Sequence, residues 1–272
     1  MGFSVNTNIG AMAALQSLND TNRSLATTQS RINSGKNVSS TKDDSGTFAI
    51  AQKLRGDLGG LGGVNSSLNR AKSTVDVAVA GAEQVSDLLN KMKAKAIEAA
   101  DVGLDATSRT ALGADFDGFV SQANSIIDSS SFNGTNLLKA GGGTVAALQS
   151  TSMTADKLDV ANQGLSAVMT AVGSAFTDAT TAAAKVATLD TQIGSVNGKM
   201  SVLGAAARKI EGQQAFISKL SDVIEAGVSN LVDADLAKES AKLQALQVKQ
   251  QLGVQALSIA NQAPQTIISL FR

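Results

Sequence analysis

The side chains best suited to chemistry in this chain are two adjacent carboxylates, Asp43 and Asp44, which follow Lys42. Two carboxylates can serve as general acid and base in hydrolysis, but they must then flank one scissile bond. Neighbours in sequence rarely converge in this way, and the surrounding residues indicate no apolar pocket. We therefore expect both acids to accept hydrogen bonds from the backbone or to pair with a cation such as Arg31.

Other catalytic chemistry lacks its usual residues. The chain contains no His, Cys, Trp or Tyr, so the common catalytic base, the thiolate nucleophile and most zinc ligands are missing. Ser and Thr have no base to activate them. Five glycines in 56–63 match no phosphate-binding motif and follow no strand. We expect a non-enzyme without catalytic, metal or cofactor-binding residues, and with no cofactor.

Charge and hydropathy exclude further classes. The 272 residues include 23 basic and 23 acidic side chains, so a nucleic acid is not expected as a partner. The most apolar windows are interrupted by Asn, Gln and Ser, so membrane insertion is not expected. The first residues, MGFSVNTNIGAMAAL, have no basic segment ahead of the apolar ones. If the protein acts outside the cell, we expect export without a cleaved N-terminal signal.

Long apolar heptad stripes are the elements that organise the chain. One keeps an unbroken spacing from Leu165 to Leu231. Two others begin at Leu68 and at Leu112. Such stripes are typical of helices that stay against partner helices. We predict a mainly α fold, an elongated coiled-coil-like bundle with helices at about 64–101, 107–130 and 162–231. The expected bundle core is Leu68, Val75, Leu89, Phe116, Leu189, Val196, Leu203, Ile210, Ile217 and Ile224.

Breaks in these patterns divide the chain. The glycines of 56–63 predict a flexible or kinked entry into the helix from Val64. Strand-like segments within about 144–160 predict one short β-hairpin. Small polar residues at 33–47 and the loss of heptad phase at 232–235 predict two linkers. We therefore expect a terminal domain of residues 1–42 plus 232–272 and a bundle domain of residues 43–231.

The two chain ends are amphipathic or apolar and almost uncharged. No charged side chain precedes Asp20, and none lies in 250–271. The C-terminal segment is apolar on two faces, so it requires neighbours on more than one side. We expect burial between several copies of the chain through Leu15, Leu18, Leu25, Ile32, Leu243, Leu246, Leu252, Leu257 and Ile259. The alternative is that the two ends pair as a simple hairpin and bind nothing further.

These ends resemble bacterial flagellin. The N-terminal similarity lies in Asn6 to Asn8, in RINSGKNVSSTKDDSGTFAIAQKL at 31–54 and in SSFNGTNLL at 130–138. The C-terminal similarity lies in LVDADLAKESAKLQ at 231–244 and QALSIANQAPQTIISLFR at 255–272. The middle of the chain leaves room for no large outer domain, so it resembles a minimal flagellin.

The resemblance implies a structural subunit that self-assembles into the extracellular flagellar filament used for swimming. It further implies export through the flagellum's own channel, a homo-oligomer possibly shared with sister flagellins, and contacts with the export apparatus, the cap and hook-associated proteins. In the family the paired termini form the inner tube around the channel, and the bundle forms the outer layer. Three alternatives are a hook-filament junction protein, a coiled-coil signalling rod and an amphipathic protein on a lipid surface.

Overall fold

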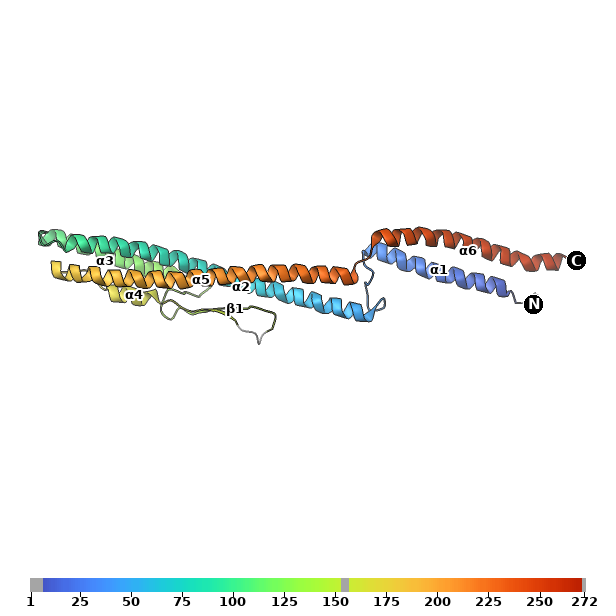
Figure 1. Cartoon of the computed structure of the whole chain (residues 1–272), viewed down its shortest axis with the longest axis horizontal. Helices are drawn as coiled ribbons and strands as arrows, with labels where there is room; N and C mark the ends of the chain where they lie inside the picture. Colours follow the sequence, from blue (N-terminus) through green and yellow to red (C-terminus); the bar gives the residue numbers. More distant parts are fainter. Residues whose placement is uncertain (1–6, 153–156, 271–272) are drawn as a thin grey trace. The chain divides into compact units, whose positions relative to one another are not determined.

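The protein is built almost entirely of helices (Figure 1). The computed structural model describes residues 7–152 and 157–270, the last eight by their backbone alone. The elements are α1 (Ile9–Ser34), α2 (Ser45–Ala99), α3 (Ala106–Ser129), β1 (Val145–Ala147), β2 (Leu158–Val160), α4 (Leu165–Val172), α5 (Ala179–Val232) and α6 (Leu236–Leu270). The expected fold class, mainly α with one short β-hairpin, is confirmed.

The chain divides into two compact units. One unit contains residues 1–56 and 223–272, and the other contains residues 57–222. The sequence predicted the divisions near 42 and 232, at the ends of the polar linkers. The two compact units divide inside α2 and inside α5, and each helix runs through its division without a break. The domain boundaries near 42 and 232 stay a prediction.

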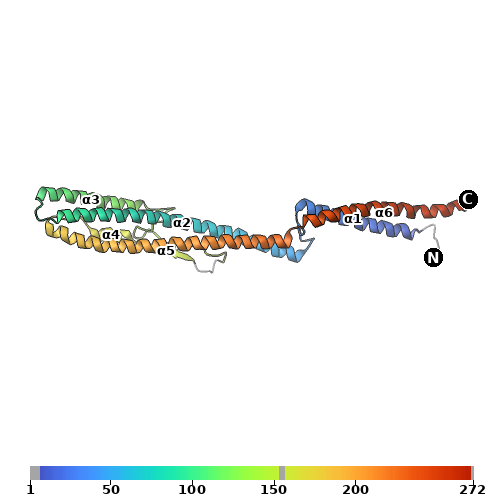
Figure 2. The ribbon, with the colours of Figure 1, turned by 45° about the horizontal axis from the view of Figure 1, so that its top comes forward.

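The unit of residues 57–222 is a helical bundle in which α2, α3 and α5 run alongside one another (Figures 1 and 2). Its core is the set of heptad stripes, since the expected core residues from Leu68 to Ile217 are all buried. Ion pairs flank the stripes: Lys72 with Glu211 and Lys93 with Asp190 join α2 to α5. The bundle is therefore held by small and medium apolar side chains, with charges at its edges.

The predicted single helix over 162–231 is wrong. It is two helices, because α4 ends at Val172 and Gly173 takes a φ of 65°, which L side chains rarely adopt. In the gap Phe176 is 5% exposed and packs edge to face on Phe116, with ring centroids 5.5 Å apart. The side chain of Asp178 then accepts from Thr181 N at 2.8 Å and starts α5.

The predicted start of the first bundle helix at residue 64 is also wrong. The helix α2 begins at Ser45 and runs through all five glycines of 56–63. Burial of Ala51 and Leu61 offsets the weak helix propensity of this stretch. Gly60 also has a steric role, since a Cβ there would lie 2.6 Å from the Thr151 methyl group.

The hairpin and its neighbouring loop pack onto the bundle. Strands β1 and β2 are antiparallel, with Ala146 opposite Asp159, and the segment 153–156 of the expected hairpin lies outside the described residues. Asn136 donates to Ile127 O at 2.6 Å, and its Oδ1 accepts from Leu138 N at 2.9 Å. Asn162 donates to Asn136 O and to Lys139 O at 2.8 Å each. These two amides hold the irregular loop between α3 and β1 in one conformation.

Candidate assembly interface on the terminal helices

The unit of residues 1–56 and 223–272 is closed by main-chain hydrogen bonds between its two linkers. Gly35 ends α1 with a φ of 68°, and its carbonyl accepts from Ala234 N at 2.9 Å. The carbonyl of Val232 accepts from Asn37 N at 2.7 Å and from Val38 N at 3.2 Å. Val38 itself is buried. The linker after α1 and the end of α5 therefore form one structure, although the sequence predicted two separate breaks.

The carboxylate pair is used within the first linker. Asp43 accepts hydrogen bonds from Ser39 N and Ser40 N, both at 3.0 Å, and also from the two hydroxyls. These bonds, led by the one from the Ser39 backbone, hold the pKa of Asp43 below its ordinary value. A carboxylate engaged in this way stabilises a turn and is poorly placed to take up a substrate proton.

Asp44 caps the following helix. It accepts from the Thr47 hydroxyl at 2.7 Å and from Gly46 N at 3.0 Å, where α2 begins. The Thr47 hydroxyl is the main reason that the pKa of Asp44 lies below its ordinary value. Of the two roles expected for these acids, bonding to the backbone is the one observed, and Arg31 binds a different acid.

Polar contacts join α1 to α6, which lie side by side and antiparallel (Figures 1 and 2). Near the chain ends Asn8 caps α1 and donates to Ala260 O at 2.7 Å. Midway, Gln250 Nε2 donates to Asn22 Oδ1 at 2.8 Å. At the other end Arg31 Nη1 donates to Glu239 Oε1 at 3.2 Å. Directional contacts at three levels fix the register between the two helices.

The predicted subunit-interface residues divide into two groups in the isolated chain. Leu246 is buried, and five others are half-buried along the seam between the helices, namely Leu18, Leu25, Ile32, Leu243 and Leu257. The remaining three face solvent: Leu15 is 48% exposed, Leu252 57% and Ile259 69%. The first group stabilises the helix pair, and the second group has no intramolecular partner that would bury it.

Sequence reasoning missed further apolar residues on the outward surface. Ile9 and Met12 on α1 and Val254 on α6 are all exposed. The heptad pattern did not mark them because they lie off the seam. The lack of charge before Asp20 was the available signal, since an exposed helix face normally carries charged residues.

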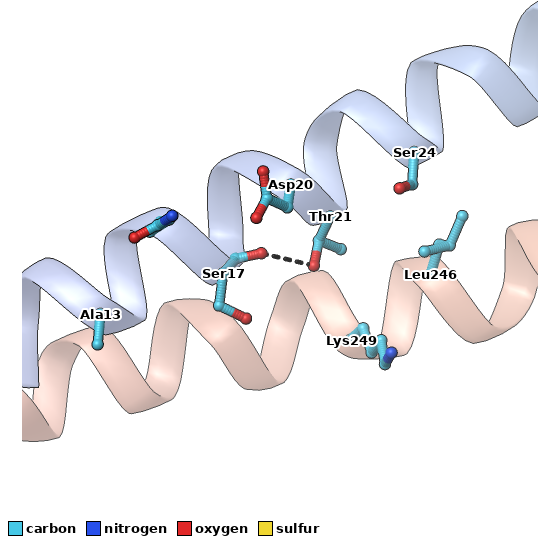
Figure 3. A pocket seen from close by; sticks show the side chains of 8 residues that line it. Ala13, Ser17, Asp20, Thr21, Ser24, Leu246 and Lys249 are labelled. Atoms are coloured by element: carbon cyan, nitrogen blue, oxygen red, sulfur yellow. Dashed lines mark hydrogen bonds between the residues drawn. The ribbon is translucent and has the colours of Figure 1, made fainter.

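Two hollows lie beside α1. The groove in Figure 3 has a volume of 440 Å³ and runs between α1 and α6, with Ser17, Thr21 and Ser24 on one side and Leu246 and Lys249 on the other. A second hollow, with a volume of 290 Å³, is lined by residues that include Met12, Leu15 and Arg23. Both include Gln16 and Asp20. Small hydroxyl side chains of α1 make up much of one wall of the first groove.

One expected core residue belongs to this unit. Ile224 is half-buried and packs against a small cluster of Ala51, Val228 and Val232. It was assigned to the bundle core because the heptad pattern continues through it. The pattern shows that α5 keeps an apolar face there, but it does not show which residues cover that face.

Neither a metal site nor a membrane span is found in the part of the chain that the structure describes. Within 7–152 and 157–270, His, Cys, Asp and Glu side chains form no group of three or more suited to a metal ion. None of the described helices has a window that is long and apolar enough to cross a bilayer.

Family models match both halves of the chain. The bacterial flagellin N-terminal helical region matches residues 5–144, and the bacterial flagellin C-terminal helical region matches residues 186–271. The chain belongs to the bacterial flagellin family. This flagellin is 43% identical to the flagellin FljM of Caulobacter vibrioides, over 99% of this chain and 98% of that protein. It is also 34% identical to a flagellin of Brucella melitensis, over 99% of each chain.

Solved structures show the same fold. A Bacillus cereus flagellin matches with a TM-score of 0.52 at 19% identity, covering 56% of this flagellin and 88% of that chain. A putative flagellar hook-associated protein from Vibrio parahaemolyticus matches with a TM-score of 0.56 at 14% identity, covering 70% and 100%. At these identities the likeness concerns the fold alone.

This flagellin is a structural subunit of the bacterial flagellar filament, which lies outside the cell. The alternative of a hook-filament junction protein is not favoured, because the nearly full-length matches are to named flagellins. Like other members of the family, this flagellin polymerises.

Proposed function

We propose that this flagellin polymerises by burying the outward apolar surface of α1 and α6 between neighbouring subunits. The observation that supports this is the exposure of large apolar side chains on both helices, including Ile9, Met12, Leu252 and Ile259. Full burial of each such side chain contributes about 1.5–3 kcal/mol. Several together supply a driving force that an isolated monomer does not use.

In this proposal the paired termini form the inner layer of the tube around a channel, and the bundle helices form the outer layer. Amide and hydroxyl side chains are the only polar groups of residues 250–270. Helices of this composition can pack on more than one side without burying a charge. The seam residues hold the pair together, and the outward residues make the contacts between copies.

We further propose that the chain leaves the cell unfolded through the flagellum's own export apparatus and adds at the distal end beneath a cap, with hook-associated proteins at the filament ends. The absence of Cys suits a chain that crosses a narrow channel without crosslinks. Sister flagellins are expected in the same filament. The role is structural, and we expect no catalytic activity.

Seeded assembly tests the proposal. Purified monomer is mixed at neutral pH with short filament seeds, and filament length is followed by negative-stain electron microscopy. Long uniform tubes are expected. Seeds that stay short, or that gain only a terminal layer, contradict the proposal.

The decisive variants are Leu252→Ser and Ile259→Ser, which remove outward apolar groups without touching the seam. They should slow elongation while the helix content of the monomer stays unchanged. A matched control is Lys238→Ser, an exposed polar position on the same helix, which should elongate like the wild type. Equal elongation by all three variants would show that the outward apolar surface has no part in assembly.

A further inference from the structure

The bundle carries an unpartnered helix face that the terminal interface does not explain. On α5, beside its buried stripe, Val202 is 52% exposed and Phe216 is 56% exposed. Phe216 is conspicuous because the chain contains only eight Phe and no other aromatic residue. Both belong to an exposed stripe with the alternating four and three spacing of the core: Gly198, Val202, Ala205, Lys209, Gly212 and Phe216. A face with this spacing can follow another helix along its length.

The charges beside this face are basic. Arg208, Lys209 and Lys219 are exposed, and none forms an ion pair within 4 Å among the described residues. The acid nearest to them in sequence, Glu211, is occupied by Lys72 of α2. The outward face of α5 is therefore positive and partly apolar.

The outward face of α2 has the opposite charge. Between residues 73 and 90 the charged side chains are Asp76, Glu83 and Asp87, with no Lys or Arg. They lie on a second exposed stripe with the same spacing: Asp76, Ala80, Glu83, Asp87 and Asn90. Asp76 has a favourable charge interaction with Lys72 of the same helix. No ion pair is found for Glu83 or Asp87 within the described part of the chain. Glu83 and Asp87 are thus free to pair with cations from outside.

We propose that the outward face of α5 docks on the outward face of α2 of a second copy of this chain. This inference rests on the proposed function, because the occupant is another subunit of the same filament. The two faces differ, so the contact is heterologous, and it can repeat from copy to copy without closing on itself. Complementary charge would also select the register of the contact and speed the encounter of subunits. Gly198 and Gly212 have open space where a Cβ would stand, which leaves room for the neighbouring helix.

Charge reversal and restoration test the contact. One variant carries Arg208→Glu with Lys209→Glu, a second carries Glu83→Lys with Asp87→Lys, and a third carries all four substitutions. Each reversed variant should elongate wild-type seeds at least about tenfold more slowly than wild type. The fourfold variant should elongate its own seeds at a rate close to that of wild type, because complementarity is restored between its copies. Monomer melting temperatures should stay unchanged, since all four side chains are exposed.

Lys157→Glu is the matched control, because it reverses an exposed charge in the same unit that belongs to neither stripe. Elongation of both reversed variants at the wild-type rate would overturn the inference, and so would a fourfold variant that is as slow as either reversed variant. Failure of the wild type itself to elongate would instead overturn the proposed function.

Cross-linking gives a second test that does not depend on charge reversal. The chain has no Cys, so Lys209→Cys and Glu83→Cys each introduce one thiol. Filaments grown from a mixture of the two variants should yield cross-linked dimers with a short bifunctional thiol reagent. Filaments of either variant alone, and mixed monomers, should not. Absence of dimers from the mixed filaments, or equal dimers in single-variant filaments, would overturn the inference.

Discussion

Arg31 of α1 donates to Glu239 of α6 across the helix pair, at 3.2 Å from Nη1 to Oε1. The side chain of Glu239 is only 10% exposed and that of Arg31 is 28% exposed. Next to them Thr28 is fully buried, and its hydroxyl, Arg31 Nε and Glu239 Oε2 have no hydrogen-bond partner. The terminal pair therefore contains a charged contact whose hydrogen bonding is incomplete in the isolated chain.

Arg31→Ala should weaken the α1–α6 pair by about 2–3 kcal/mol, somewhat less than for a fully buried pair, because it leaves the Glu239 carboxylate with only the more distant Lys242 Nζ, 4.0 Å from Oε2. The double variant Arg31→Met with Glu239→Leu should be close to neutral, because it removes both charges. Amide hydrogen exchange in α1 and α6 of the monomer measures both effects. A double variant that exchanges faster than Arg31→Ala would contradict this account.

Leu203→Asp should destabilise the bundle by about 4 kcal/mol or more, because Leu203 is completely buried and a carboxylate there has no partner. Ser201→Asp is the control on the same helix, since Ser201 is exposed. Thermal melting of the monomers measures the difference. Equal melting temperatures for the two variants would refute the assignment of Leu203 to the core.

Gly81→Ala should destabilise the bundle, because the new methyl group would lie 2.8 Å from Leu138 Cδ1 and closer still to the Ser130 hydroxyl. Gly118→Ala on α3 should instead stabilise it by up to about 1 kcal/mol. Nothing lies within 4 Å of a Cβ at Gly118. Urea denaturation of both variants would show shifts of opposite sign, and shifts of the same sign would contradict the packing at Gly81.

Acidification should lower the stability of the folded chain, because it protonates carboxylates that cap its helices. The pKa values of Asp44, Asp105 and Asp178 are lowered, mainly by hydrogen bonds from Thr47, Ser108 and Thr181 respectively. A lowered folded-state pKa means that the stabilisation is complete above the ordinary value of about 3.8 and is lost as the pH falls through the folded-state value. Melting temperatures should therefore fall below about pH 4.

Asp178→Asn separates this effect from the cap itself, because Asn can still accept the hydrogen bond from Thr181 N. The variant should keep its melting temperature at neutral pH and lose less of it on acidification than the wild type. An unchanged acid slope would show that Asp178 does not contribute to the pH dependence.

Removal of residues 250–272 should leave the bundle folded and stop polymerisation. The truncation deletes the exposed Leu252 and Ile259 and the Gln250 contact to Asn22, but it touches none of the buried stripe from Leu68 to Ile217. Circular dichroism should show the helix content of the remaining chain, and electron microscopy should show no filaments. Filaments from the truncated chain would contradict the role given to α6.

Much of the fold could be predicted from residue spacing. The heptad stripes identified the buried residues of α2, α3 and α5, because a face that stays against a partner must keep its apolar phase. The break between α4 and α5 was missed, since Ala175 and Ala179 keep the phase while Gly173 and the inserted Phe176 interrupt the helix. The early start of α2 was missed for the opposite reason, because packing overrode the low propensity of its glycines.

The candidate interface was predicted only in part. The uncharged ends indicated burial, and the spacing identified the seam residues together with Leu15, Leu252 and Ile259. It could not show which of them one copy already buries, because that depends on how α1 and α6 face each other. The ion pair of Arg31 with Glu239 could not be predicted from the sequence either, because the two residues are 208 positions apart.

That separation has a consequence for folding kinetics. Asn8 reaches Ala260 across 252 residues, and every described contact between α1 and α6 closes a loop of similar size. Such closures are entropically unfavourable and slow to form. When the chain is delivered from one end, α1 must wait for almost the whole remaining sequence before it can pair. Under the proposed export, the terminal pair would therefore form last, once the complete subunit has arrived.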